Sequence, residues 1–451
     1  MLSQFKSCYD HLPREERQAL MLRALLYALV GLALGYRVWL VFNFNPIDHI
    51  WSDPERHWDQ GIDVLRSDPM SLIDPILYQV YIGAFAKLTL KTHELAAFYT
   101  ALLSVGMTWL WYRFLRELLP SKNWALLGWA LIAWSPSNSS IYSYFMQETL
   151  MLPLLGASLW ATWRARRKGT LNAFLGATAL WLLAGLTRGI CLPLGLVALA
   201  WIWFEQGDKA RRAAWGMVVM LLMLGPLTYR SFQQANIFAP HGIGSLVQAY
   251  HRSGAQEILI GYELRGARWE FGFTSPGILQ KPFEPLSDWM SKRQGSVRFF
   301  VNMDAGERDW KAAVTNTPLT LDRYLWLTGD NLIHLFFAES WPDTDRSRDI
   351  GELNHWLRWL WAPLFILCAT GTIWLWREQR ERLLPVLLLT WFCVQGLFPL
   401  SVNEGRYRKP MEGLLIAQAV LLASTLAARR RREEVAQPAP AAPETLIVSS
   451  T

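Results

Sequence analysis

Ten apolar segments, several of them short for a membrane span, restrict the fold of this chain more than any other feature. They lie near residues 20–43, 93–113, 124–136, 148–163, 171–187, 189–204, 213–230, 356–376, 383–400 and 411–428. About 20 apolar residues in a helix cross the ~30 Å hydrocarbon core of a bilayer. Only 18% of the residues are charged, whereas soluble domains carry about a quarter. We therefore expect an all-α polytopic membrane protein with about ten transmembrane helices, and a soluble enzyme is excluded.

Lysine and arginine residues in the short connecting segments predict the orientation of the chain, because cytoplasmic loops are enriched in them. These residues are Lys6, Arg14 and Arg17; Arg113, Arg116 and Lys122; Arg164, Arg166, Arg167 and Lys168; Lys209, Arg211 and Arg212; Arg377, Arg380 and Arg382; and Arg429 to Arg432. With ten spans, all of these segments lie on the same side of the membrane. We therefore expect a plasma membrane protein, in bacteria of the inner membrane, with both termini in the cytoplasm. The net charge of +7 is then explained by the membrane flanks, and no nucleic acid partner is needed.

The spans and loops divide the chain into five parts. They are a cytoplasmic segment (1–19), a module of seven spans (20–230) that includes the external loop 44–92, an external loop domain (231–355), a module of three spans (356–428) and a basic, then disordered, cytoplasmic tail (429–451). The external loops form a small mixed periplasmic domain. Within it, residues 319–337 are amphipathic, and we expect an interfacial helix because Asp322, Asn331 and His334 would be costly in lipid. A further pair of spans in 231–355 would raise the total to twelve.

The first external loop combines carboxylates with aromatic side chains. Asp48, Asp53, Glu55 and Asp59 alternate with His49, Trp51, His57 and Trp58, and the acidic pattern continues through Asp63, Asp68 and Asp74. One interpretation of such a loop is a solvated surface without a specific function. The loop also suits sugar recognition, because rings stack on a sugar face while carboxylates accept its hydroxyl protons. The second reading is favoured by the position of the cluster, close to the end of the first span.

Further charged residues fall on the same external side. Arg188 and Arg230 lie at span ends, where the simpler role is contact with lipid headgroups. Arg406, Arg408 and Lys409 place three cations on the side that should be poor in them, so an anion is expected nearby: a phospholipid headgroup or a lipid phosphate substrate. Glu148 begins the fourth span, as a structural partner for an arginine or as a substrate contact.

These segments together resemble the GT-C superfamily of membrane glycosyltransferases, which use polyprenyl-phosphate sugars. The resemblance is to the protein O-mannosyltransferase and lipid A aminoarabinose transferase type. It is carried by Asp53-Pro54-Glu55-Arg56-His57, by Asp74-Pro75-Ile76-Leu77-Tyr78, by Leu186-Thr187-Arg188 and by Glu404-Gly405-Arg406-Tyr407-Arg408-Lys409-Pro410; the segment from Pro226 to Arg230 is also similar. His57 departs from the pattern, since a tyrosine is commoner there.

The resemblance implies an inverting glycosyltransferase in which Asp53 is the catalytic base. The sugar and the acceptor would contact Asp48, Glu55, His57, Asp59, Tyr78 and Glu148, and the lipid phosphate would contact Arg188, Arg230, Arg406, Arg408 and Lys409. The implied partners are a polyprenyl-phosphate-linked sugar donor, a lipid, polysaccharide or protein acceptor, and membrane lipids. No cofactor is required and no metal ligand is assigned, and the resemblance does not decide whether a divalent metal takes part.

Three other functions compete with this one. A flippase or transporter of lipid-linked saccharides would carry charges deep in several spans, whereas here they concentrate at the external face. A ligase or polymerase of the O-antigen type also handles a lipid-linked sugar outside, and would depend on His and Arg without Asp. A non-catalytic scaffold of envelope assembly would tolerate substitution of Asp53, Arg188 and Arg406.

Overall fold

The structure, a computed structural model, describes most of the helical part of the chain. The described residues are 13–51, 53–62, 75–235, 240, 257–264, 267–274, 296–302, 307–309, 321–338, 348–379, 381–397 and 405–436. Within residues 1–19 and 429–451 only the parts next to the spans are therefore described. Asp63, Asp68, Asp74 and Glu404, named above, lie outside the described residues.

Each of the ten apolar segments lies on a helix. These helices are α2 (Arg14–Asn43), α5 (His93–Leu118), α6 (Lys122–Trp134), α8 (Glu148–Lys168), α9 (Leu171–Thr187), α10 (Cys191–Glu205), α11 (Lys209–Ala235), α15 (Arg348–Trp374), α16 (Leu383–Trp391), which continues as the π-helix η5 (Phe392–Leu397), and α17 (Lys409–Ala436). Among the described residues, five helices are long and apolar enough to cross a membrane, and three more are apolar but shorter. A mainly helical chain with several candidate membrane spans is thus confirmed, consistent with an all-α membrane protein, while the number of ten crossings stays a prediction.

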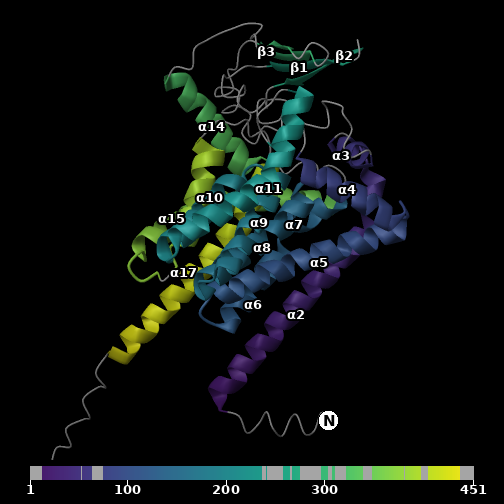
Figure 1. The fold of residues 1–451 in the computed structure, drawn as a ribbon. Helices are drawn as coiled ribbons and strands as arrows, with labels where there is room; N and C mark the ends of the chain where they lie inside the picture. Colours follow the sequence, from purple (N-terminus) through teal and green to yellow (C-terminus); the bar gives the residue numbers. More distant parts are fainter. Residues whose placement is uncertain are drawn as a thin grey trace, which may run out of the picture.

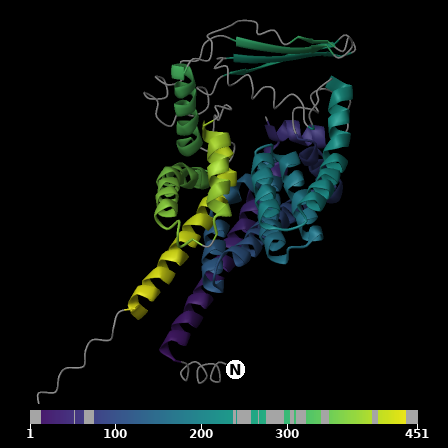
Figure 2. The same cartoon turned by 60° about the vertical axis from the view of Figure 1, so that its left-hand side comes forward.

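Short helices and one small sheet connect the spans. The helices are η1 (Pro46–His49), α3 (Asp53–Ile62), α4 (Ile76–Thr89), α7 (Ser137–Ser140), η3 (Ile141–Ser143), α14 (Leu321–Phe337) and η6 (Gly405–Arg408). The strands are β1 (Glu257–Leu264), β2 (Ala267–Thr274), β3 (Ser296–Asn302) and β4 (Glu307–Asp309), in the order β2-β1-β3-β4. Strand β1 is antiparallel to β2 and parallel to β3, with Ile260 opposite both Phe271 and Phe299. The sheet lies beyond α11 and α14 at one end of the molecule (Figures 1 and 2).

The helix ends that carry the basic residues gather at the opposite end of the molecule. Arg166 of α8 contacts Glu205 of α10 and Glu381, at 2.7 and 2.6 Å. Arg167 pairs with Glu117 of α5, Arg429 of α17 pairs with Glu378, and Arg23 of α2 binds Asn123 of α6. The start of α2 and the end of α17 also lie at this end (Figures 1 and 2). The contacts therefore agree with the alternation expected from the positive charges, and the cytoplasmic location of this end stays a prediction.

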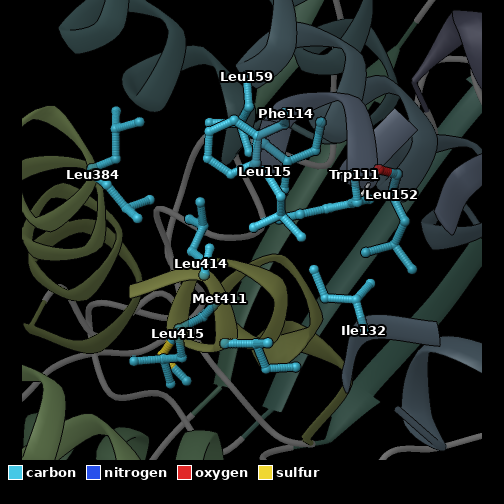
Figure 3. Close-up of a cluster of buried hydrophobic side chains, with 14 of the residues drawn as sticks. Trp111, Phe114, Leu115, Ile132, Leu152, Leu159, Leu384, Met411, Leu414 and Leu415 are labelled. Carbon is cyan, nitrogen blue, oxygen red and sulfur yellow. Dashed lines mark hydrogen bonds between the residues drawn. The ribbon is translucent and has the colours of Figure 1, made fainter. Parts of the chain in front are cut away.

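Trp111 of α5 lies at the centre of the largest hydrophobic core. Its ring packs against Gly156 of α8 and Gly413 of α17, where an added Cβ would approach ring atoms to 2.8 and 2.5 Å. Its Nε1 donates a hydrogen bond to the carbonyl of Leu152 at 3.1 Å, and side chains of α17 such as Leu414 lie nearby (Figure 3). Small residues allow this close approach, which drives helix association in lipid, where the hydrophobic effect between helices is absent. The core thereby fixes the first module against α17.

Helix α14 packs against the π-helix η5. The side-chain amide of Asn331 donates to the carbonyls of Gln395 and Gly396 at 2.8 and 2.9 Å, and the hydroxyl of Tyr324 donates to that of Leu397 at 2.7 Å. A π-helical turn and a helix end both leave carbonyl oxygens without their usual partners. Asn331 and His334 are buried, so contact with protein also avoids the cost of polar groups in lipid. The interfacial position of this helix stays a prediction.

Candidate functional site

Helix α3, which begins with Asp53, is held by a small aromatic core. Trp58 stacks on Phe145 with ring centroids 4.7 Å apart, and both belong to a buried cluster with Tyr78 and Phe85 of α4. Gly61 of α3 contacts Gly83 of α4 so closely that a Cβ at either position would overlap the other helix. Because two glycines allow the backbones to meet, α3 has a fixed position on α4. The carboxylate of Asp53 is therefore placed by packing as well as by its own ion pairs.

Asp53 forms ion pairs with two arginines. Its Oδ1 lies 2.6 Å from Nη1 of Arg56, one turn further along α3. Its Oδ2 lies 3.1 Å from Nη1 of Arg406 in η6. The side chain of Asp53 is 21% exposed and that of Arg406 is 11% exposed. Two segments from opposite ends of the chain, both singled out in the sequence, thus meet in one partly accessible cluster.

Arg188 joins the same cluster through Tyr407 and Glu148. Its guanidinium lies 4.9 Å from the centre of the Tyr407 ring, and that of Arg406 lies 5.6 Å from the same ring. Its Nη1 is 3.1 Å from Oε1 of Glu148, whose side chain is completely buried while that of Arg188 is 15% exposed. Cation–π and ionic contacts of this kind are strengthened by removal from water. Arg188 and Arg406 are therefore gathered around one aromatic ring.

The two remaining cations of the last motif have internal partners. Arg408 contacts Glu412 at 3.0 Å and donates to the carbonyls of Leu335 and Phe336. Lys409 donates to the carbonyl of Ser137 at 2.5 Å, and the hydroxyl of Ser137 donates to Glu412. Arg408, Lys409 and Glu412 are all buried. This group braces the start of α17 against α7 and α14, so it supports the site from behind.

Arg37 of α2 is a buried charge that the sequence analysis missed. Its Nε donates to the carbonyl of Ala133 at 2.8 Å, and its other nitrogens donate to the carbonyls of Ile132 and Asn138 and to the hydroxyl of Ser104. The C-terminal carbonyls of a helix carry partial negative charge, so Arg37 caps α6. An arginine inside a span is itself a signal of function or structure, and that signal was available in residues 20–43.

The segment Ser137–Gln147, between α6 and α8, is buried against the surrounding helices. Arg37 binds the carbonyl of Asn138, Lys409 binds that of Ser137, and His49 lies 3.1 Å from that of Ser143. Burial raises the pKa of the Tyr142 phenol far above its ordinary value, and it does the same for Tyr81 of α4. Both phenols therefore stay neutral at physiological pH. The segment meets the cluster at Met146, whose sulfur lies 3.9 Å from Nη1 of Arg406.

The other predicted site residues have different environments. Asp48 lies 2.9 Å from His93 on the surface, and Glu55 and Asp59 are exposed on α3. His57 is buried and meets the ring of Tyr78 edge-on at 5.1 Å. Glu148 is fully buried and contacts Arg188, and its predicted contact with the sugar stays a prediction. Arg230 lies near the end of α11 and is half-buried.

Comparison with models of protein families, with curated proteins and with solved structures found no match. Within the described residues, no group of three or more His, Cys, Asp or Glu side chains could hold a metal ion. The site offers one partly exposed carboxylate, that of Asp53, beside three partly exposed guanidinium groups, those of Arg56, Arg188 and Arg406. It lies at the end of the molecule where the sheet lies (Figure 1).

Proposed function

We propose that this chain is an integral membrane glycosyltransferase that moves a sugar from a polyprenyl-phosphate donor to an acceptor hydroxyl. The observation that carries the proposal is the 3.1 Å ion pair between Asp53 and Arg406, with Arg188 on the ring of Tyr407. Three of the sequence segments that resemble GT-C enzymes supply these residues. A proton acceptor and two phosphate-binding groups, brought together at a helix-bundle surface, are the groups that such a transfer needs.

The reaction follows from the charges of the cluster. The acceptor oxygen attacks C1 of the sugar and its proton passes to Asp53, while the bond between C1 and the phosphate oxygen breaks with inversion at C1. The electron pair of that bond stays on the phosphate, which leaves as an anion and needs no strong acid. Arg188 and Arg406 stabilise the growing charge, because guanidinium groups bind phosphate oxygens in a bidentate manner. The leaving phosphate also competes with Asp53 for Arg406, which makes the carboxylate a stronger proton acceptor as the reaction proceeds.

The remaining predicted residues have narrower roles in this scheme. Exposed Glu55, Asp59 and Asp48 are available to sugar or acceptor hydroxyls, whereas buried His57 and Tyr78 support α3. Arg408 and Lys409 are assigned to the brace of α17 instead of the phosphate, because buried carbonyls and Glu412 already bind them. The site faces the periplasmic or external side of the plasma membrane, with both termini in the cytoplasm. The polyprenyl tail lies along the apolar spans.

Purified protein tests the proposal directly. Mass spectrometry of co-purified lipids should find a polyprenyl-phosphate sugar, and reconstituted protein should transfer that sugar to an acceptor. Asp53→Asn should reduce transfer by about 10²–10⁴-fold, the usual contribution of a general base. Glu94→Gln is a matched control, because Glu94 is an exposed carboxylate at the start of α5.

The competing functions give different outcomes in the same experiment. Lipid movement across the bilayer that persists in Asp53→Asn, with no transfer by the wild type, would identify a flippase. Full transfer activity in a folded Asp53→Asn protein would remove Asp53 as the base and favour a ligase or polymerase that depends on His and Arg. If the wild type and the variants show neither sugar transfer nor lipid movement, a scaffold is indicated.

A further inference from the structure

Glu148 is a completely buried carboxylate at the first residue of α8. Burial of a charge costs several kcal/mol by itself, so a compensating charge is required. Arg188 supplies it at 3.1 Å, and the positive charges of Arg406 and Lys409 also act on Glu148. Besides these charges, the backbone N–H of Glu148 itself contributes a hydrogen bond to the carboxylate. Glu148 is therefore held mainly by the surrounding cations, together with the partial positive charge at the start of its helix.

The cations around Glu148 differ in their exposure. Lys409 is buried and donates to Ser137. Arg188 and Arg406 keep 15% and 11% of their side-chain surface exposed, and both contact the Tyr407 ring. Two guanidinium groups on one ring repel each other, and a carboxylate behind them reduces that repulsion. Glu148 thus lies on the buried side of the pair, whereas both arginines keep part of their surface accessible to solvent.

We infer that Glu148 is a positioning residue for the proposed transfer: it is the buried counter-ion that holds Arg188 and Arg406 together to receive one phosphate group of a lipid. The inference rests on the proposed function for the identity of that lipid. Glu148 acts through the two arginines and does not touch the substrate. It replaces the role of sugar contact that the sequence predicted for this residue.

Equilibrium binding of a polyprenyl monophosphate to the purified full-length protein tests this role, with the polyprenol of the same length as the neutral reference. Glu148→Gln removes a negative charge next to an anion site, so electrostatics alone would strengthen phosphate binding. The positioning role requires the opposite result. In Glu148→Gln the ratio of the affinities for the phosphate and for the polyprenol should fall about tenfold, which is the scale of effect seen when residues that support a binding site are changed. General damage to the fold would weaken the binding of both lipids equally.

A matched control is available at the other end of the molecule. Glu205→Gln breaks a comparable bridge, 2.7 Å from Arg166, and should keep the wild-type preference. Glu148→Asp keeps the charge but shortens the side chain by one methylene group, which makes it the safer variant for folding. It should also lose preference for the phosphate. Wild-type or stronger preference in either folded Glu148 variant would overturn the inference.

The outcomes separate this inference from the proposed function. If the wild type prefers the phosphate lipid but transfers no sugar, the glycosyltransferase proposal fails and the role of Glu148 is still decided by the binding data. If the wild type transfers sugar and the Glu148 variants keep their phosphate preference, only the inference fails. No preference for phosphate in the wild type would contradict both.

Discussion

Nη1 of Arg406 lies 3.1 Å from Oδ2 of Asp53, although 353 residues separate them in the sequence. The contact joins α3, in the loop predicted to be the first external one, to the turn η6 that precedes α17. Under the proposed function, Arg406→Gln should therefore reduce transfer by about 10²–10³-fold, as loss of one charge-stabilising donor does in a hydrolase. Initial rates in proteoliposomes check this. Arg429→Gln, at the opposite end of the molecule, should keep full activity; an equal loss there would show that the effect is not specific to the site.

Close packing of α3 on α4 gives a second prediction, because Gly83 and Gly61 touch. Gly83→Ala should displace α3 and lower transfer at least tenfold, even though alanine favours a helix by up to about 1 kcal/mol over glycine. Gly106→Ala in α5 is the matched control, since its Cβ would enter open space. That variant should match or exceed wild-type stability at full activity. Wild-type activity in Gly83→Ala would show that the contact does not position Asp53.

Removal of the Arg37 side chain should destabilise the protein far more than removal of a surface arginine. Arg37→Leu leaves buried carbonyls and the Ser104 hydroxyl without a donor, and a hydrogen bond to a charged group contributes ~1.5–3 kcal/mol. We expect at least about 3 kcal/mol of lost stability, measured by unfolding in mixed micelles. Arg23→Gln breaks only an exposed hydrogen bond to Asn123 and should change stability by about 0–0.5 kcal/mol. Equal stabilities would mean that Arg37 is not a cap of α6.

The buried Tyr142 phenol predicts how stability depends on alkaline pH. Its pKa is raised in the folded protein by burial, so above the ordinary pKa of tyrosine, about 10, the unfolded chain loses this proton while the folded protein keeps it. Stability contributed by the neutral phenol is complete below about pH 10 and falls as pH rises above it. Tyr142→Phe should show a shallower loss of stability between about pH 10 and 11 than the wild type does. Identical slopes would mean that Tyr142 does not contribute.

The sequence predicted helices well because each apolar segment encodes its own structure. Length and composition alone placed a helix at every one of the ten segments, from α2 to α17. The misplaced cation Arg406 and the acidic loop at Asp53 were also visible as local anomalies, and they meet in the structure.

Partnerships across long separations could not be predicted in the same way. Arg408 and Lys409 carry the same local signal as Arg406, but contacts with Leu335 and Ser137, about 70 and 270 residues away, direct them inward. The segment Ser137–Gln147 is polar in sequence, and only the surrounding elements show that Arg37, His49 and Lys409 bind its carbonyls. The local sequence pattern thus identifies unusual charged residues, but it does not show whether each one binds a substrate or another part of the protein.

The cap that Arg37 places on α6 has a consequence for biogenesis. α2 is synthesised first, and the carbonyls of α6 and Asn138 that bind its arginine come about 95 to 100 residues later. Insertion of an arginine at the centre of a span costs ~2.5–3.5 kcal/mol in translocon measurements, and the cost is smaller for Arg37, which lies nearer to one end of the predicted span 20–43. We therefore expect α2 to gain its full membrane stability only after α6 has been synthesised. A nascent chain stopped before residue 138 should then expose α2 to the quality-control proteases of the membrane more than the full-length chain does.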